Sequence, residues 1–583
     1  MKRLMLIPLL LTAQLLTAAS TQSTGSAPAT PAIPTVKSLF PWLSPDIPSA
    51  AAVAFTPIDV IVRFKHAPTA FDLLMVGPAK KQFKSINAVE VMMTPFAMQL
   101  LQNVPDILYI TPNRPHKASL DITTKTVNAN LAWNLGWTGA GVGVAVIDSG
   151  IAHRADLNDP TGKSRVVYEQ SFVSSQTALD DYGHGTHVAG IIGSDGLAST
   201  GTGFTRTYKG VAPGVNLIDL RVLDQNGNGY DADVISAIET AISLKNTYNI
   251  RVINLSLGRP VYESYTLDPL CQAAEAAWQA GIVVVAAAGN YGRTGTYGIN
   301  GYGTIAAPGN DPYVITVGAT NTKHTTATYD DSIASYSSRG PTAIDHIVKP
   351  DIVAPGNGVT SLLASTSCTL FASFPTTHLT DNSYETNGSA SVSSSDYYVL
   401  SGTSMATPVV SGAVAILLQK TPSLTPDQVK ERLMRSAAKF LPPFMSAFDA
   451  ITGLGFGSQS DVFTVGAGYL DINAALSNTD LISRSALSPT AIYDTATHKV
   501  TISNLVWGAD LDLGVVWGDT SIYGSAMFTG ALVNSNPVIW GADQTLGVVW
   551  GDSTNTAFGV VWGDSVVWVN APLTATASDD SDQ

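Results

Sequence analysis

Three short segments of the chain contain the residue types that nucleophilic catalysis on a carbonyl group requires. Ser404 lies in GTSMATP (402–408), His184 in GHGTHVAG (183–190) and Asp148 in VAVIDSG (144–150). A free serine hydroxyl is a weak nucleophile, so an imidazole must accept its proton and a carboxylate must hold the imidazole in the correct tautomer. Together the three segments predict a serine peptidase.

Each of these residues also has an ordinary structural interpretation when it is taken alone. An aspartate after a strand is usually a cap or turn residue, and a histidine among glycines usually packs or makes a hydrogen bond. A serine before Met-Ala-Thr-Pro usually caps a helix. The complete set of three segments favours catalysis over these separate interpretations.

The elements around the three residues predict where each side chain lies. The apolar, β-branched run that ends at Asp148 predicts a buried parallel strand, with the carboxylate at the carboxyl end of the sheet. His184 and Ser404 follow glycine or Gly-Thr, and each opens a small-residue helical pattern. Both side chains are therefore expected at helix N-termini, where backbone donors favour developing negative charge.

The order Asp148, His184 and Ser404, with these flanking glycines, resembles the subtilisin-like serine proteases, the subtilases. The resemblance covers the chain from about Asn128 to about Leu476. It implies that Asn290, in AAAGN (286–290), joins the backbone N–H of the nucleophilic serine in an oxyanion hole.

The same resemblance implies how a substrate binds and what precedes the cleaved bond. A substrate would lie as an added strand between two extended segments, Gly227-Asn228-Gly229 and Ser256-Leu257-Gly258. Ala306 aligns with the floor of the primary pocket, where no acidic residue is present to pair with a cationic side chain. Apolar or medium-sized residues are therefore expected immediately before the scissile bond.

His187 and the candidate calcium ligands take structural interpretations. The family pattern makes His184 the catalytic histidine, so His187 is expected to be structural, and no metal-ligand spacing accompanies the pair. The resemblance also implies that catalysis needs no cofactor.

Structural calcium is common in the family, but Asp224 to Gly229 lacks the glutamate of a calcium loop and predicts a turn. Asp156 matches a family calcium position without recognisable partner ligands, so calcium stays unassigned.

Length, composition and net charge limit the number of domains and the kinds of partner that this chain can have. The chain has 583 residues, which is too long for one core, and 45% of them are hydrophobic. Its formal net charge of -14 argues against nucleic acid and anionic membrane surfaces as partners. Polypeptide substrates are the expected partners.

Residues 1–19 predict a secretory signal peptide, because Lys2 and Arg3 precede an apolar stretch too short to span a membrane. A Ser, Thr, Ala and Pro-rich linker follows at 20–50. Residues 51–117 predict a small α+β unit, with strands at 59–64 and 107–112 and a helix at 95–103. No later segment predicts a transmembrane helix, so we expect a secreted protein, extracellular or at the cell surface.

A small α+β domain at this position resembles the family's inhibitory propeptide, which would be an intramolecular inhibitor of this chain. Self-cleavage is then expected between about Pro115 and Lys125. A permanent N-terminal domain is the alternative.

The peptidase domain is expected at 118–477, with an α/β, subtilisin-like three-layer fold. Apolar runs predict strands at 215–223, 250–257, 281–288 and 313–319. Helical patterns occupy 231–245, 267–280 and 425–439, and Thr425-Pro426-Asp427-Gln428 predicts a capping box. The result is a parallel sheet with helices on both faces.

Two features of the peptidase domain leave alternatives open. The Ser/Thr-rich stretch from Gly356 to Ser401 predicts a surface insertion beside the substrate cleft, either functional or inert. Cys271 and Cys368 are the only two cysteines. They either form a disulfide or stay apart, with Cys271 as a small buried hydrophobe.

Residues 478–583 carry a Trp-Gly repeat that lies outside the resemblance. Six of the ten tryptophans fall there, after apolar pairs that predict short strands. Their faces would bind cell wall, sugar or a polymer, or they would form the tail's own core. The alternative function is accordingly an adhesive protein whose peptidase domain only processes its own precursor. The intact set Asp148, His184, Asn290 and Ser404 favours a secreted serine endopeptidase.

Overall fold

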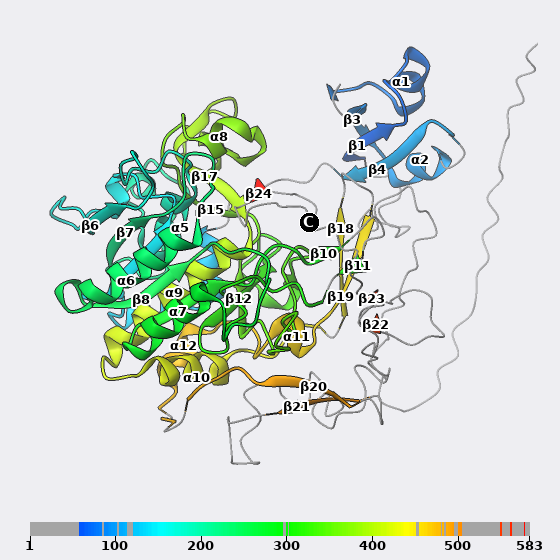
Figure 1. Cartoon of the computed structure of the whole chain (residues 1–583). Coiled ribbons are helices and arrows are strands. Elements are labelled where there is room, and N and C mark those ends of the chain that lie inside the picture. Colours follow the sequence, from blue (N-terminus) through cyan, green and yellow to red (C-terminus); the bar gives the residue numbers. More distant parts are fainter. Residues whose placement is uncertain are drawn as a thin grey trace, which may run out of the picture. The chain divides into compact units, whose positions relative to one another are not determined.

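The computed structural model of the chain (Figure 1) describes two compact units, Met1–Pro115 and His116–Gln583. The described residues are 57–83, 87–101, 104–112, 120–294, 299–300, 302–442, 444–449, 454–479, 481–482, 485–494, 499–503, 549–550, 560–561 and 576–577. The predicted signal peptide, the linker and most of the Trp-Gly region lie outside these residues. Those interpretations stay predictions.

The first unit is a small α+β body. Its antiparallel sheet has the strand order β2-β3-β1-β4, formed by β1 (Ile58–Phe64), β2 (Lys81–Phe83), β3 (Ala88–Met93) and β4 (Ile107–Pro112). Two short helices, α1 (Ala70–Val76) and α2 (Pro95–Leu100), accompany it. Alternate residues of β1 such as Val60 and Val62 are buried with Met98 of α2, so one face of the sheet holds a separate core.

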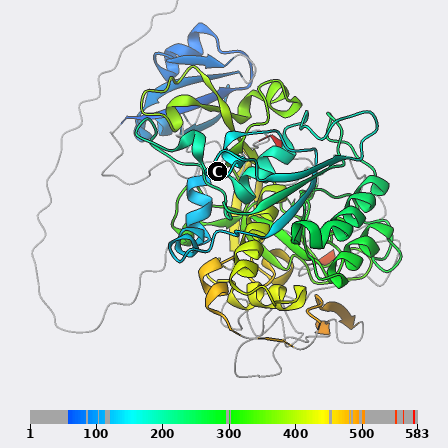
Figure 2. The same cartoon turned by 90° about the vertical axis from the view of Figure 1, so that its left-hand side faces the viewer.

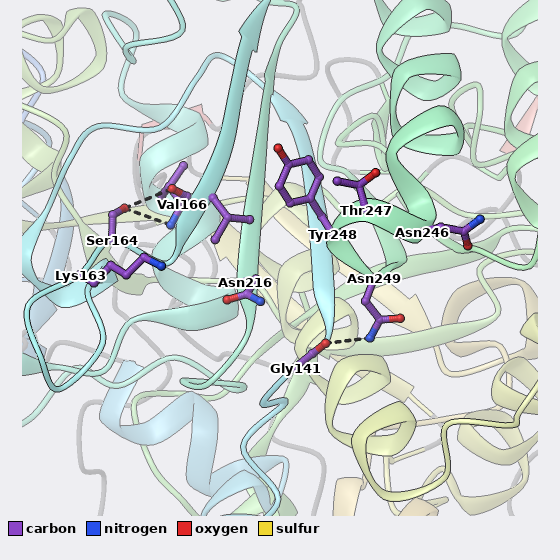
Figure 3. Close-up of a pocket in the computed structure, with 10 residues that line it drawn as sticks. Gly141, Lys163, Ser164, Val166, Asn216, Asn246, Thr247, Tyr248 and Asn249 are labelled. Atoms are coloured by element: carbon purple, nitrogen blue, oxygen red, sulfur yellow. Dashed lines mark hydrogen bonds between the residues drawn. The ribbon is translucent and has the colours of Figure 1, made fainter.

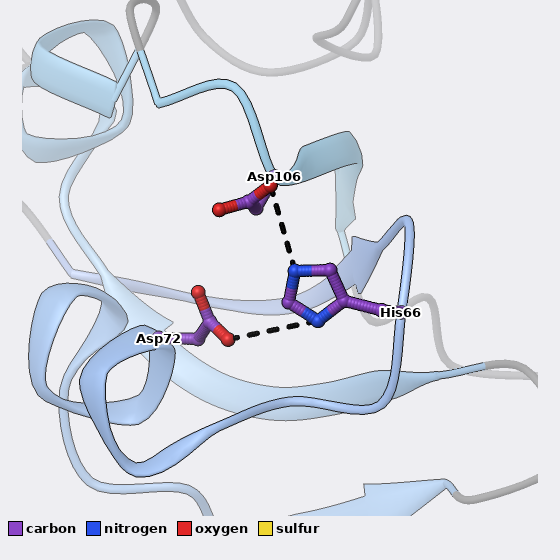
Figure 4. A group of neighbouring side chains, drawn as sticks. All are labelled: His66, Asp72 and Asp106. Atoms are coloured by element: carbon purple, nitrogen blue, oxygen red, sulfur yellow. Dashed lines mark ion pairs between the residues drawn. The ribbon is translucent and has the colours of Figure 1, made fainter.

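Three titratable side chains, His66, Asp72 and Asp106, lie close together near the start of α1. Thr69 and Asp72 form a reciprocal capping box there. The His66 imidazole lies 4.0 Å from the Asp72 carboxylate and 3.5 Å from that of Asp106 (Figure 4). His66 and Asp106 are 45% and 46% exposed, so these ion pairs contribute little to stability.

The second unit is built on an eight-stranded sheet with the order β13-β12-β9-β8-β5-β7-β6, in which β14 also pairs with β12. Its central strands pair in parallel, and their residues are buried on both faces. The strands are β5 (Gly143–Asp148), β6 (Val166–Ser171), β7 (Asn216–Arg221), β8 (Ile250–Leu255), β9 (Val283–Ala287), β12 (Ile315–Asn321), β13 (Ser332–Ile333) and β14 (Ile352–Pro355).

Two pairs of helices cover this sheet and give the α/β, three-layer fold that the sequence predicts. Helices α6 (Asp231–Tyr248) and α7 (Pro269–Gln279) pack together on one face, and α5 (His184–Gly193) and α9 (Thr403–Lys420) on the other (Figures 1 and 2). None of the described helices is long and apolar enough to cross a lipid bilayer. The remaining helices are α3 (Leu120–Thr126), α4 (Ala129–Asn134), α10 (Pro426–Ser436), α11 (Val462–Val465) and α12 (Ile472–Ser477).

The observed bounds refine those expected from the sequence. The capping box before α10 is confirmed, because Thr425 and Gln428 exchange hydrogen bonds. Strand β12 begins at Ile315 and not at the predicted residue 313. The carbonyl oxygens of Tyr313 and Val314 accept hydrogen bonds from the Lys430 ammonium instead of a neighbouring strand.

The segment from Gly356 to Ser401, which the sequence predicted as a surface insertion, is folded. Its two ends are buried, whereas residues 372–393 are mostly exposed or half-buried. It contains β15 (Val359–Leu362), α8 (Thr369–Ser373), β16 (His378–Thr380) and β17 (Ser393–Ser401). Tyr384, Tyr397 and Tyr398 are at most 1% exposed. Because the Tyr384 and Tyr397 rings pack with each other and with Tyr208 of the main domain, the insertion shares its core.

Cys271 and Cys368 are both free and buried, so they do not form the disulfide that the sequence left open. Cys271 lies in α7 and its thiol contacts the side-chain oxygen of Asn310 at 3.3 Å. Short strand pairs complete the description: β10 (Arg293–Thr294) with β11 (Ile299–Asn300), β18 (Phe444–Asp449) with β19 (Leu454–Gln459), β20 (Thr490–Asp494) with β21 (Lys499–Ser503), β22 (Val549–Trp550) with β23 (Val560–Val561), and β24 (Thr576–Ala577) with β17.

Candidate active site

Asp148 and His184 meet at the carboxyl end of the central strand. Asp148 is the last residue of β5, and His184 is the first residue of α5. Nδ1 of His184 lies 2.7 Å from Oδ1 of Asp148, and both side chains are buried. A carboxylate oxygen only accepts hydrogen bonds, so this contact places the proton of the neutral imidazole on Nδ1 and leaves Nε2 as the basic nitrogen.

The start of α5 is fixed by Asp180, a residue that the sequence interpretation missed. Its buried carboxylate accepts hydrogen bonds from the backbone N–H groups of Gly183 and Thr186 and from the hydroxyl groups of Thr186 and Ser149. Ser149 in turn accepts from Gly185 N–H, while its own N–H donates to Asp148. This network ties the strand that carries the aspartate to the helix that carries the histidine. An acid shortly before a glycine-led helix was its only sequence signal.

The insertion also holds the residue before His184. The Tyr398 hydroxyl donates to the carbonyl oxygen of Gly183 at 2.6 Å. Gly183 has a φ of 108°, and a Cβ there would lie 2.6 Å from the Cys368 sulfur. Only glycine fits this position, which explains the glycine before His184.

The electrostatics of His184 suit a base. Burial lowers the pKa of the imidazole, but the charge and hydrogen bond of Asp148, with the charge of Asp180, raise it above its ordinary value of 6.5. Nε2 is buried and makes no hydrogen bond to any described residue. The nitrogen that would accept a proton in catalysis is therefore free of hydrogen bonds to the described residues.

Ser404 occupies the first turn of α9, a helix that packs against α5. The hydroxyl of Ser256 donates to the Ser404 carbonyl oxygen at 2.8 Å and accepts from the amide of Asn254. The Asn254 side chain also accepts a hydrogen bond from the Ser411 hydroxyl, which lies seven residues after Ser404 in α9. These buried contacts attach α9 to the end of β8 and the residues after it.

Asn290 has the geometry of an oxyanion donor. Its Oδ1 accepts hydrogen bonds from the backbone N–H and hydroxyl of Thr403, at 2.9 and 3.0 Å, whereas its buried Nδ2 makes none to the described residues. A Cβ at Gly402 would lie 3.2 Å from that Nδ2 and 3.6 Å from the backbone nitrogen of Ser404. The two donors therefore flank one small volume, the arrangement that a developing oxyanion needs.

The residues expected to bind substrate are brought to the same end of the sheet. Ser256, Leu257 and Gly258 follow β8, and Arg259 pairs with Ala307 through two backbone hydrogen bonds. Ala306 is buried, and its methyl group lies 3.2 Å from the Cβ position of Gly289, beside Asn290.

The turn that the sequence predicted for this loop follows β7 and runs from Asp224 to Gly227, where the Gly227 N–H donates to the Asp224 carbonyl oxygen at 3.0 Å. Asn228 and Gly229 come directly after it. The carboxylate of Asp224 accepts the N–H groups of Asn226 and Asn228. Because Asp224 closes its own turn, it is not arranged as a calcium ligand.

The other candidate calcium ligand does not fit the role either. Asp156 accepts hydrogen bonds from the Tyr397 hydroxyl at 2.6 Å, from the Ser194 hydroxyl and from Ala198 N–H. Donors on both carboxylate oxygens occupy the positions that a cation would need. One of these donors, Tyr397, is a buried residue of the insertion.

His187 contacts two strands of the insertion, β15 and β17. Its Nε2 lies 3.0 Å from the Val359 carbonyl oxygen, and its ring packs edge-on against Tyr398. Burial lowers the pKa of His187 to about 3, and the charge of His184 acts in the same direction. The imidazole is therefore neutral at physiological pH, as a structural residue would be.

One surface hollow lies at the opposite end of the sheet (Figure 3). Gly141, Val166, Asn216 and Asn249 line it at the amino ends of their strands. Strand β5 separates it from Asp148 by about 17 Å. This hollow takes no part in the site around Ser404.

Comparisons with known proteins agree with the geometry. A model described as the subtilase family matches residues 139–468, which include Asp148, His184, Asn290 and Ser404. The serine protease AprX of Bacillus subtilis (strain 168) is 39% identical over 371 residues, which are 62% of this chain and 76% of AprX. Subtilisin E of the same organism is 33% identical over 402 residues, 67% of this chain and 87% of subtilisin E. Subtilisin DY of Bacillus licheniformis is 35% identical over 343 residues, 58% of this chain and 92% of subtilisin DY.

The chain therefore belongs to the subtilase family and is a subtilisin-like serine endopeptidase.

Proposed function

We propose that this endopeptidase is exported as a self-processing precursor and cuts polypeptides through an acyl-enzyme on Ser404. One observation carries the assignment of roles. Nε2 of His184 and Nδ2 of Asn290 are buried without hydrogen bonds, while the opposite ends of the same side chains are held by Asp148 and Thr403. Buried polar atoms are normally paired, so two unpaired ones support roles in which a reacting group supplies the missing partner.

The chemistry follows from these positions. Oγ of Ser404 attacks the scissile carbonyl carbon and its proton passes to Nε2 of His184, whose cation is stabilised by Asp148. The carbonyl oxygen becomes an oxyanion and accepts from Nδ2 of Asn290 and the Ser404 N–H. The tetrahedral intermediate collapses as His184 protonates the leaving amine. A water molecule, deprotonated by His184, then attacks the ester and releases the acid.

Substrate binding uses the residues at the carboxyl end of the sheet. The substrate would lie between Gly227-Asn228-Gly229 and Ser256-Leu257-Gly258 and add main-chain hydrogen bonds to both. The small buried Ala306 leaves the primary pocket without an acidic floor. A cationic side chain there would lose its hydration without gaining a partner, so apolar or medium-sized residues are preferred.

The first unit is proposed as the inhibitory propeptide. It has its own core and precedes the peptidase domain, with the boundary between them at Pro115. Export rests on the segment 1–19, whose basic start and short apolar stretch are those of a signal peptide.

The test is hydrolysis of casein by purified wild-type enzyme and by the Ser404→Ala variant. The hydroxyl is needed for covalent chemistry alone, so the variant is expected to lose turnover and keep its circular dichroism spectrum. Unchanged proteolysis by a folded Ser404→Ala variant would exclude the proposed nucleophile.

A further inference from the structure

Helix α8 of the insertion begins beside the chain that leads into His184. Thr369, the first residue of α8, donates its backbone N–H to the carbonyl oxygen of Asp181 at 3.1 Å. Leu370, the second residue, donates to the carbonyl oxygen of Tyr182 at 3.0 Å. The first N–H groups of a helix have no partner within the helix, so they need acceptors from outside it. The start of α8 and the segment before His184 therefore hold each other.

Strand β17 of the insertion holds the next carbonyl oxygen, that of Gly183. Its donor is the hydroxyl of Tyr398, at 2.6 Å, and the side chain of Tyr398 is buried. Burial is the main reason that the pKa of this phenol lies well above its usual value of 10. The phenol therefore keeps its proton at neutral and mildly alkaline pH and remains a donor. All three carbonyl groups that directly precede His184 are thus bound by the insertion.

The insertion also contacts the first turn of α5, which His184 opens. The Ser361 hydroxyl donates to the carbonyl oxygen of His187 at 2.8 Å, and Nε2 of His187 lies 3.0 Å from the Val359 carbonyl oxygen. The His187 ring packs edge-on against Tyr398. The helix and the segment before it are therefore attached to the same two strands, β15 and β17.

The same strand β17 continues into the helix of the proposed nucleophile. It ends at Ser401, and Ser404 lies in the first turn of α9 three residues later. A hydrogen bond from Gly402 N–H to the Gly356 carbonyl oxygen, at 2.9 Å, joins the two ends of the insertion at this point. One strand therefore contacts the segment before His184 and leads directly to Ser404.

We propose that Tyr398 and the start of α8 position His184 relative to Ser404. This role rests on the proposed function, in which His184 is the base and Ser404 the nucleophile. Proton transfer requires the two side chains within hydrogen-bond reach, and a displacement of about 1 Å can lower a rate by about 10². Because β17 is bonded to the segment before one residue and continuous with the helix of the other, it keeps their separation constant. Tyr398 acts through the Gly183 carbonyl group and is therefore a positioning residue.

The first test removes the hydroxyl of Tyr398 and keeps its ring. Tyr398→Phe retains the packing against His187 and deletes the donor to Gly183. Steady-state hydrolysis of a peptide substrate is measured on enzyme purified from expression of the full chain, with active sites titrated so that kcat refers to folded enzyme. We expect kcat to fall about tenfold and KM to change by less than about twofold, because the base moves while the substrate-binding segments are untouched.

Tyr397→Phe is the matched control. Tyr397 is the neighbouring residue of β17 and is equally buried, but its hydroxyl donates to Asp156 at 2.6 Å. Deleting that hydrogen bond should lower the stability in chemical unfolding and leave kcat and KM within about twofold of wild type. Wild-type kcat in Tyr398→Phe, or an equal fall of kcat in both variants, would overturn the positioning role.

A second variant tests the start of α8. Thr369→Pro deletes the N–H that Asp181 accepts, and the proline ring takes the place of that N–H, so the carbonyl group must move. Proline is favoured at the first position of a helix, and the preceding Cys368 has the extended backbone that suits a residue before proline. The helix should therefore form, while kcat falls and KM stays within about twofold of wild type. An unchanged kcat would contradict the role of α8, and if Tyr398→Phe fails to fold, Thr369→Pro decides.

Reaction with a fluorophosphonate separates the positioning role from the proposed function. Labelling of Ser404 in the wild type, with a reaction about tenfold slower in Tyr398→Phe, would support both. Equal rates in the two enzymes would show that the positioning role is wrong while the proposed function stands. A wild-type enzyme without label on Ser404 would contradict the function on which that role rests.

Discussion

Replacing Asn290 by alanine removes two different functions of one side chain. Its Nδ2 is the proposed oxyanion donor, and its Oδ1 accepts the N–H and the hydroxyl of Thr403 at the start of α9. The variant should therefore lose activity through the first function and stability through the second. The two losses can be measured separately.

The expected magnitudes follow from these contacts. One oxyanion-hole donor contributes about 2.7–4 kcal/mol to transition-state stabilisation, and each tenfold change in rate corresponds to about 1.36 kcal/mol. Asn290→Ala should lower kcat by about 10²–10³ with little change in KM, because the amide is aimed at the oxyanion and not at the bound substrate. Leaving Thr403 N–H without an acceptor should also cost about 1–3 kcal/mol of stability.

Two further variants separate the functions. Asn290→Asp retains an oxygen for Thr403 but cannot donate and places negative charge beside the oxyanion, so its stability should recover while its kcat stays low. Asn310→Ala is the matched control. Asn310 is a fully buried asparagine whose Nδ2, like that of the partly buried Asn290, makes no hydrogen bond to the described residues. That variant should lose stability and keep kcat within a few-fold of wild type.

The assay is steady-state hydrolysis of a peptide substrate, with active sites titrated so that kcat refers to folded enzyme. Chemical unfolding of each variant gives the stability difference. A pure KM effect in Asn290→Ala, or a loss of kcat in Asn310→Ala as large as in Asn290→Ala, would refute the assignment of the oxyanion donor.

Four other predictions test separate parts of the account. The pH profile of kcat/KM should fall on the acid side with a midpoint above 6.5, because the pKa of His184 is raised and its cation cannot accept a proton; a midpoint well below 6.5 would contradict this. N-terminal sequencing of the secreted enzyme should find a junction between about Pro115 and Lys125, and normal processing of an isolated Ser404→Ala precursor would rule out self-cleavage. Asp351→Ala should destabilise the fold by about 3–5 kcal/mol in chemical unfolding, since the buried ammonium groups within 2.8 and 3.2 Å of this carboxylate lose their counter-charge; a neutral result would show that the pairing is not needed. A peptide library should show apolar or medium-sized residues before the scissile bond, and dominance of Arg or Lys would show that the pocket around Ala306 is misassigned.

Much of the central sheet could be predicted because its signals are local. The β-branched run before Asp148 has no polar residue on either face, as a strand buried on both sides requires. The glycine before His184 and the Thr425 capping box mark helix starts that the structure shows at α5 and α10. The strand and the two helix starts depend on residues that are neighbours in the sequence, so a pattern of a few residues is enough to predict them.

The parts that escaped prediction depend on contacts between distant residues. The Ser/Thr-rich composition of the insertion suggested a solvated loop, yet Tyr397 and Tyr398 turn into the main core and bind Asp156 and Gly183. The late start of β12 depends on Lys430, more than a hundred residues away. Asp180 could have been noticed as an acid before a helix, but one of its four donors, the Ser149 hydroxyl, comes from a segment 31 residues earlier in the chain.

The central claim is that Ser404 is the nucleophile and that His184 activates it. The most direct measurement is mass spectrometry of the active enzyme after reaction with a fluorophosphonate, which modifies serines that are activated in this way. We expect one adduct per molecule, on the peptide that contains Ser404, and its loss in the His184→Ala variant. An adduct on a different residue, or equal labelling of Ser404 without His184, would contradict the account.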